Sequence, residues 1–464
     1  MQPSLLVPRS AVERKRKRSL VDVALDPAQE AALALPRERP LLVLGEAGHG
    51  KTTVLLHRIA RVRRAAERST VIVPTEGLVR LLQPALRRLG VDVTVMTFDR
   101  FAALQARRSF RRLPHESELT PPAVMRLKRS AALRDAIAVV AARDGEVSRR
   151  DLLHLFGDRA LMERLGLPEH VVEAVLEWTH VQFTKRTEEE WAHVTDRTRL
   201  VALDGRALDD GTATAHAATI DVEDYAVLFE LDRLRAVRPR VPRAFDLIAI
   251  DEAQELAPLE LALLGRSLAP GGTLVVAGDA DQHTDETGDF VGWDAAMRAL
   301  GAPDHATTTL AIGFRCPPAV VRVARAVRDS TADGGMTVAH FGDEAALVAT
   351  LGPAMKRILD HDSGASIAVV CRRATTARRL WSLFRAHVPA RLVFDGRFLP
   401  RGPIQVCVVA DVKGLEVDWV VVPDASTTEW PADAPSRRAL YVALTRARHQ
   451  AVLACVGEPS AIVA

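Results

Sequence analysis

The chain has 464 residues, of which 48% are hydrophobic and 26% are charged, and its formal net charge is +3. This composition is typical of a globular protein of about three domains, and the near balance of charge neither requires nor excludes a polyanionic partner. The apolar runs are far shorter than the roughly 20 residues of a membrane-spanning helix, so no membrane segment is predicted. The four cysteines are widely spaced, which argues against a disulfide framework or a zinc site and favours a cytoplasmic location.

Residues 1–25 are predicted to form a flexible basic tail. Positions 14–18 read R-K-R-K-R, and no apolar stretch of the kind found in signal peptides follows them. We expect a solvated arm, and contact with nucleic acid or a polymerase is the alternative.

Strand-like and helix-like patterns then alternate, which predicts the first part of an α/β lobe over residues 26–100. Short apolar runs at 41–44, 71–73 and 91–96 are typical of strands. Between the first two, residues 51–64 place apolar side chains at helical spacing. Such β-α-β units build parallel sheets.

The pattern changes between residues 101 and 245, where long amphipathic stretches such as 131–142 and 170–178 predict a mostly helical insertion. The insertion carries an arginine cluster at 107–112 and an acidic cluster at 188–190. We expect both to be solvated helix faces, and nucleic-acid binding is the alternative for the arginines.

The sheet pattern resumes at 247–250 and 273–277, which completes the first lobe over residues 246–312. A second α/β lobe is predicted for residues 313–464, with a helix at 375–385. Its expected strands are 366–371, 391–394, 404–410 and 419–422.

The sequence G-E-A-G-H-G-K-T at 45–52 fits the phosphate-binding loop G-x-x-x-x-G-K-[ST]. The glycines of such a loop let backbone N–H groups approach phosphate oxygens, and here they are Gly45, Gly48 and Gly50. Lys51 would supply charge to the β and γ phosphates, and the Thr52 hydroxyl would coordinate Mg²⁺. A strand pattern before the loop and a helix pattern after it support this assignment, which predicts ATP and Mg²⁺ as cofactors.

Glu46 is an unusual residue inside such a loop. A carboxylate beside phosphates repels them, so we expect its side chain to point away from the nucleotide.

Two acidic motifs follow predicted strands. In D-L-I-A-I-D-E-A-Q at 246–254, Asp251 is placed to contact Mg²⁺ and Glu252 to orient and deprotonate the attacking water. In G-D-A-D-Q at 278–282, Gln282 is placed to sense the γ phosphate.

The order of these elements resembles that of superfamily 1 helicases of the UvrD/Rep type. The segments at 71–77 and 93–101 lie where the family has its first polynucleotide-contact motifs. The sequence L-D-P-A-Q at 25–29 resembles the adenine-recognition motif, which implies that Gln29 reads adenine.

Three further motifs of the second lobe extend the resemblance. G-F-R-C-P at 313–317 implies that Phe314 stacks on adenine and that Arg315 reaches the γ phosphate. V-K-G-L-E-V-D-W-V at 412–420 implies Gly414 on the polynucleotide side and Glu416 at the ribose. Y-V-A-L-T-R-A-R at 441–448 implies Arg446 as the arginine finger.

The resemblance implies two RecA-like P-loop lobes with parallel sheets that close on one ATP. An arginine finger acts only when such a cleft shuts, so hydrolysis would be tied to lobe movement. The motif residues are intact, and we therefore expect an active ATPase. The family implies an ATP-dependent DNA helicase or translocase that moves on single-stranded DNA from 3′ to 5′.

Three departures favour an alternative function. The segment after G-D-A-D-Q lacks the base-stacking aromatic residues at the family's usual spacing, the T-F-T-N segment is replaced by P-T-E-G, and only about 95 residues separate G-F-R-C-P from V-K-G-L-E. The loops at 57–60 and 71–90 are similar to those of the HelD branch. That likeness implies an ATPase that remodels or recycles RNA polymerase.

Overall fold

The computed structural model describes residues 6, 21, 24–63, 67–201, 212–313, 316–331, 337–394, 396–399 and 402–463. The basic run at 14–18 lies outside the described residues, as do Phe314 and Arg315. No helix in the described ranges is both long and apolar enough to cross a membrane.

The first lobe is built on a six-stranded parallel sheet in the order β3-β2-β6-β7-β1-β8. Alternate residues of its strands face two apolar layers. Helices α2 (Pro27–Ala34), α3 (Lys51–Val62) and α4 (Glu76–Arg88) cover one face, and α13 (Pro258–Arg266) and α14 (Trp293–Ala299) cover the other. The strands are β1 (Leu41–Gly45), β2 (Ser69–Val73), β3 (Thr94–Thr97), β6 (Phe245–Ile250), β7 (Leu268–Gly278) and β8 (Ala306–Leu310).

The chain between β3 and β6 forms the expected mostly helical insertion. Its apolar core is continuous with the face of the first sheet that α13 and α14 cover, so the insertion extends the first lobe rather than forming a separate body. A short parallel pair, β4 (His115–Glu116) and β5 (Thr219–Ile220), ties its two ends together. The helices are α5 (Phe98–Ser109), α6 (Pro122–Lys128), α7 (Leu133–Ala141), α8 (Arg150–Phe156), α9 (Arg159–Glu163), α10 (Glu169–Gln182), α11 (Thr187–Glu190) and α12 (Glu223–Arg235).

The second lobe repeats the architecture with a parallel sheet in the order β11-β12-β10-β13-β14-β9. Helices α15 (Pro318–Asp329), α18 (Val409–Val412) and α19 (Ala434–Leu444) cover one face, and α16 (Glu344–His361) and α17 (Ala374–Phe384) cover the other. The strands are β9 (Val338–Phe341), β10 (Ile367–Cys371), β11 (Ala390–Leu392), β12 (Ile404–Val408), β13 (Val417–Val422) and β14 (Ala447–Val456). The predicted fold class is therefore confirmed.

Several predicted strands are shorter in the structure: those expected at 91–96, 391–394 and 404–410 are β3, β11 and β12. The strand expected at 404–410 ends at Val408, and α18 begins at Val409. The Asp411 carboxylate accepts a hydrogen bond from the Val408 backbone N–H at 3.1 Å, which caps this short helix although the apolar run continues through it.

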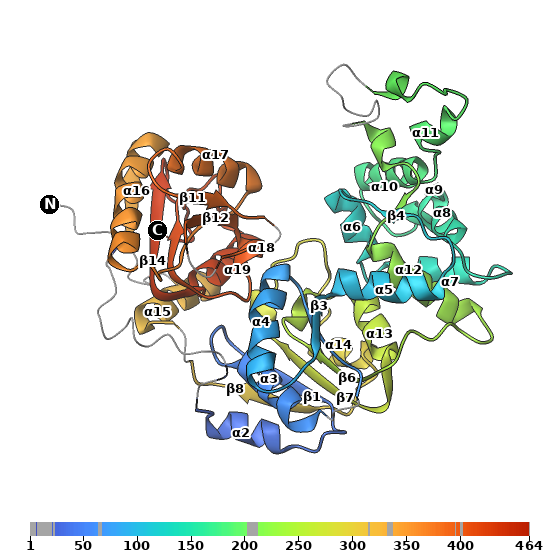
Figure 1. Ribbon diagram of the computed structural model, residues 1–464, viewed down its shortest axis with the longest axis horizontal. Coiled ribbons are helices and arrows are strands. Elements are labelled where there is room, and N and C mark those ends of the chain that lie inside the picture. Colours follow the sequence, from blue (N-terminus) through green and yellow to red (C-terminus); the bar gives the residue numbers. More distant parts are fainter. Residues whose placement is uncertain are drawn as a thin grey trace.

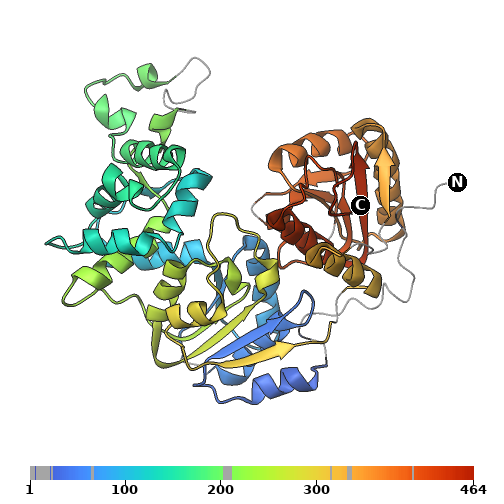
Figure 2. The same cartoon turned by 180° about the vertical axis from the view of Figure 1, so that it is seen from behind.

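The second lobe and the insertion are two projections from the first lobe (Figures 1 and 2). The first sheet lies at the base between them, and the second lobe, at the upper left of Figure 1, faces the carboxyl-terminal ends of its strands. Ligand sites of open α/β sheets lie at such strand ends.

Candidate nucleotide site and adjoining cleft

The phosphate-binding loop connects β1 to α3 in the conformation that its glycines permit. Gly48 and Gly50 have φ angles of 80° and 84°, which other residues adopt at a cost. Lys51, at the start of α3, donates hydrogen bonds to the carbonyls of Gly45 and Glu46 at 2.6 and 3.1 Å. The loop therefore forms a cradle at a helix N-terminus, which is suited to phosphate.

Two oxygen atoms that could bind a metal ion lie close together beside this cradle. The Thr52 hydroxyl donates to Asp251 Oδ2 at 2.7 Å, and Asp251 is 2% exposed. Burial and the neighbouring Glu252 raise the pKa of Asp251 to about 6. A hydroxyl and a carboxylate in an anion-rich pocket fit Mg²⁺, which prefers hard oxygen ligands and would offset the crowded negative charge.

Glu252 lies two residues beyond the end of β6 in a left-handed conformation with φ 54°. Gln254 Nε2 donates to its carboxylate at 2.7 Å. Burial alone would raise the pKa of Glu252, but the cations Lys51, Lys413 and Arg446 hold it below its usual value. The residue is therefore ionised at neutral pH, as a base that accepts a proton from water must be.

The two lobes meet at two predicted site residues, Gln282 of the first lobe and Arg446 of the second. Arg446, immediately before β14, donates from Nη2 to Gln282 Oε1 at 2.5 Å, and each residue is 1% exposed. Gln282 in turn donates to Asp279 Oδ2 at 2.7 Å. The proposed sensor of the first lobe and the proposed finger of the second lobe are thus in direct contact.

Gln29 lies against the phosphate-binding loop, where its Nε2 donates to the His49 carbonyl at 3.4 Å. Its Oε1 accepts from the Asp26 backbone N–H at 3.0 Å, so both ends of the amide contact protein. Glu416 accepts a hydrogen bond from Arg448 at 2.5 Å. Adenine recognition by Gln29 and ribose binding by Glu416 stay predictions, as do the roles of Phe314 and Arg315.

Two residues that connect the motifs were not predicted from the sequence as site residues. Gln254 Oε1 accepts from the Asp279 backbone N–H at 3.0 Å, so Gln254 joins the segments that carry Glu252 and Gln282. Lys413, from the second lobe, donates to the Gln282 carbonyl at 2.6 Å and also pairs with Glu255. Both residues lie inside the motifs at 246–254 and 412–420, and a polar side chain next to apolar residues was the available signal.

The expectation for Glu46 is confirmed. Its carboxylate accepts hydrogen bonds from Arg325 at 2.8 and 3.0 Å and from Arg328 at 2.9 Å, both on α15 of the second lobe. The side chain is thereby held away from the cradle.

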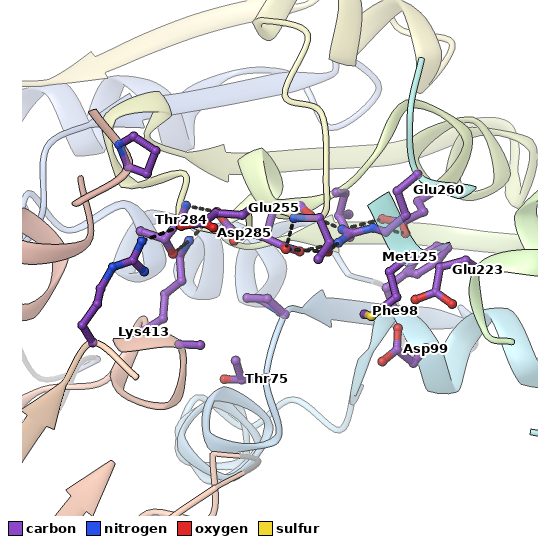
Figure 3. Close-up of a pocket in the computed structure, with 18 of the residues that line it drawn as sticks. Thr75, Phe98, Asp99, Met125, Glu223, Glu255, Glu260, Thr284, Asp285 and Lys413 are labelled. Atoms are coloured by element: carbon purple, nitrogen blue, oxygen red, sulfur yellow. Dashed lines mark hydrogen bonds and ion pairs between the residues drawn. The ribbon is translucent and has the colours of Figure 1, made fainter. Parts of the chain in front are cut away.

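A cleft of about 770 Å³ adjoins this site and is lined by both lobes and the insertion. Thr75 and Phe98 come from the ends of β2 and β3, Glu223 comes from the insertion, and Lys413 comes from the second lobe (Figure 3). Its wall is acidic. The carboxylates are Asp99, Glu223, Glu255, Glu260, Asp285, Glu286, Glu429 and Asp433, and the cations are Arg129, Arg372, Arg373 and Lys413.

Comparison with known families decides the identity. A family model described as an AAA domain matches residues 29–287, more than half of the chain, and a model of the UvrD-like helicase C-terminal domain matches residues 407–454. The chain belongs to the UvrD-like helicases of superfamily 1. It is accordingly an ATP hydrolase of the helicase class. Neither match singles out the HelD branch.

Other comparisons add little to this helicase assignment. No curated protein matches the chain. Among solved structures, the C-terminal domain of a possible DNA helicase from Lactobacillus plantarum WCFS1 is similar, with 20% identity, coverage of 33% of this chain and 93% of that domain, and a TM-score of 0.28. The assignment therefore depends on the two family models and on the two-lobed fold.

Proposed function

We propose that this UvrD-like helicase couples ATP hydrolysis between its lobes to movement along single-stranded DNA, in the 3′ to 5′ direction. The observation that carries the proposal is the cleft that both lobes line beside the ATP motifs. Lys413 lines this cleft and also bonds the carbonyl of Gln282. A strand bound in the cleft would therefore touch the same segment that meets the arginine finger.

In this proposal each polar residue of the site has a task. Lys51 and the loop glycines bind the phosphates, and Thr52 and Asp251 hold Mg²⁺, which screens phosphate charge when bound. Glu252 accepts the proton of the attacking water. Gln282 and Arg446, already in contact across the lobes, would stabilise the charge that develops on the transferred phosphoryl group. Arg315 is assigned the same task by resemblance alone.

The cations that line the cleft are already paired with carboxylates, which affects how tightly DNA would bind. The four cations of its wall are engaged by carboxylates: Arg129 with Glu260 and Asp285, Lys413 with Glu255, Arg372 with Glu286, and Arg373 with Glu429. DNA phosphates would compete with these pairs. We therefore expect DNA binding to be weak, because few cations are left to hold the backbone, and salt should weaken it further through the phosphate contacts that do form.

The test is the steady-state rate of ATP hydrolysis with and without single-stranded DNA across a salt series. The proposal predicts strong stimulation that fades as salt rises. An intact basal rate with no stimulation at any salt concentration would contradict it. Glu252→Gln protein, which should bind nucleotide without turnover, controls for contaminating ATPases.

The same acidic wall favours a second candidate function, that of an ATPase which remodels a protein partner. The loop 283–289 contains no Phe, Tyr or Trp that could stack on bases, and the nearest such residues along the chain are Phe290 and Trp293. RNA polymerase is the partner that the HelD-like loops suggest. Stimulation of the ATPase by RNA polymerase but not by DNA would select this candidate.

A further inference from the structure

The tip of the phosphate-binding loop is docked on the second lobe. Besides the bonds from Glu46 to Arg325 and Arg328, Ala47 packs against the apolar cluster of the second lobe. The side chain of Tyr441, on α19, lies against the Ala47 backbone. The phosphate-binding loop of the first lobe is therefore in direct contact with the second lobe.

Arg328 lies at the junction of three segments. Its guanidinium is 2.9 Å from Glu46, 3.4 Å from Asp281 of the G-D-A-D-Q motif, and 5.6 Å from the centre of the Tyr441 ring. Arg325 reaches the other oxygen of the Glu46 carboxylate at 2.8 Å. Both arginines come from one face of α15, three residues apart, so they move with the second lobe as a unit.

These contacts change the electrostatics of the cradle. Partial burial would raise the pKa of Glu46, but Arg328 and Arg325 hold it below its ordinary value, so the side chain is an anion. With both guanidinium groups in place its charge is compensated. If the second lobe moves away, one uncompensated negative charge stays on the loop that must hold ATP phosphates.

We propose that Glu46 acts as a charge switch that makes nucleotide affinity depend on lobe closure. When Arg325 and Arg328 are docked, the cradle accepts ATP. When the lobes separate, the exposed Glu46 carboxylate repels the bound phosphates and promotes release of ADP. Glu46 and the two arginines are positioning residues here, because they act through the charge of the cradle rather than on the reacting atoms.

This inference rests on ATP binding at the phosphate-binding loop but not on which polymer or protein is moved. The two can be told apart. Loss of ATP binding in Lys51→Ala tests the nucleotide site itself, whereas DNA stimulation tests the proposed track. Neither result changes how Glu46 should respond to its arginines.

The experiment is equilibrium binding of a fluorescent ADP analogue to the full chain. We expect the double variant Arg325→Gln/Arg328→Gln to bind about five- to tenfold more weakly, the size of one charge interaction near a protein surface. Adding Glu46→Gln should restore affinity to within about twofold of the starting protein. The conservative variant Arg325→Lys/Arg328→Lys keeps both charges and should retain affinity. Arg379→Gln, which removes an exposed arginine paired with Glu344 inside the second lobe, is the matched control and should change nothing.

Two outcomes would overturn the proposal. If the arginine substitutions weaken binding equally with glutamate or glutamine at position 46, the arginines contact the nucleotide themselves. If they leave affinity unchanged, the charge of Glu46 has no effect on the cradle. Because the Lys variants preserve charge and the Glu46→Gln change is nearly isosteric, these readings do not depend on one variant folding.

Discussion

At the scale of single residues, hydrolysis should depend most on Lys51 and Glu252. We expect Lys51→Ala to lose nucleotide binding and turnover, because its amine places a positive charge at the phosphate-binding loop. Glu252→Gln should bind ATP but turn it over at least 100-fold more slowly, because an amide cannot accept the proton of water. Single-turnover assays with circular dichroism as a control for folding measure both effects. Normal turnover by Glu252→Gln would refute its role as general base.

Arg446 should show a different signature. Its contact with Gln282 crosses the two lobes, so its charge is expected to act in the closed state. Arg446→Ala should keep ATP affinity within a few-fold while turnover falls about 1,000-fold or more. Binding and turnover are compared on the same preparation, with Arg446→Lys as a second variant that keeps charge. An equal collapse of affinity and turnover would identify Arg446 as a ground-state contact.

Glu223 should make DNA binding pH-dependent. Burial, with Asp221 and Asp99 nearby, raises the pKa of this cleft carboxyl to about 7. It is therefore mostly ionised at pH 8 and mostly neutral at pH 6, so an anionic strand should bind a few-fold more tightly at the lower pH. Fluorescence anisotropy at both pH values measures this. The variant Glu223→Gln separates Glu223 from other titrating groups: if it retains the full pH dependence, Glu223 is not the cause.

At the scale of elements, a buried cluster of charged side chains stabilises the insertion. Lys128 at the end of α6 is 2% exposed and lies 2.6 and 2.7 Å from Asp221 and Asp224. Lys128→Met should lower the free energy of unfolding by about 3–5 kcal/mol, because two buried carboxylates lose their cation. Arg159→Met, which removes an exposed ion pair with Glu173, is the control and should have little effect. Equal urea midpoints for both variants would contradict this account.

The elements that sequence could predict are those with a local signal. The run at 41–44 and the glycines after it predict β1 and the loop because apolar pattern and backbone freedom are local properties. β14 was not predicted as a strand, because its first half is polar and only half buried. Its direction is set by pairing with β13 and β9, which no local pattern records.

Among the site residues, too, those with a local sequence signal could be predicted and those that depend on long-range contacts could not. Thr52 and Asp251 lie 199 positions apart, yet each could be predicted because each lies in a recognisable motif. The partners of Glu46 could not be predicted, because Arg325 is 279 positions away on an ordinary amphipathic helix. The sequence indicated only that this side chain should point away from the nucleotide, and the fold supplies the arginines that bind it.

At the scale of the whole molecule, three parts surround one cleft (Figures 1 and 3). The first lobe and insertion share a core, whereas the second lobe has its own two clusters. Several contacts between the lobes are polar, such as Glu46–Arg325, Lys413–Glu255 and Gln282–Arg446. Polar contacts can be remade in a second arrangement without exposing a core, which suits lobes that open and close in each cycle.

The central claim is ATP-driven movement along single-stranded DNA, and the most direct test is displacement of streptavidin from biotinylated oligonucleotides. The account predicts that ATP speeds displacement from the 5′ end and not from the 3′ end, because a 3′ to 5′ motor runs into the 5′ block. Glu252→Gln should give no displacement. Equal rates at both ends, or no effect of ATP while the ATPase is active, would contradict the claim.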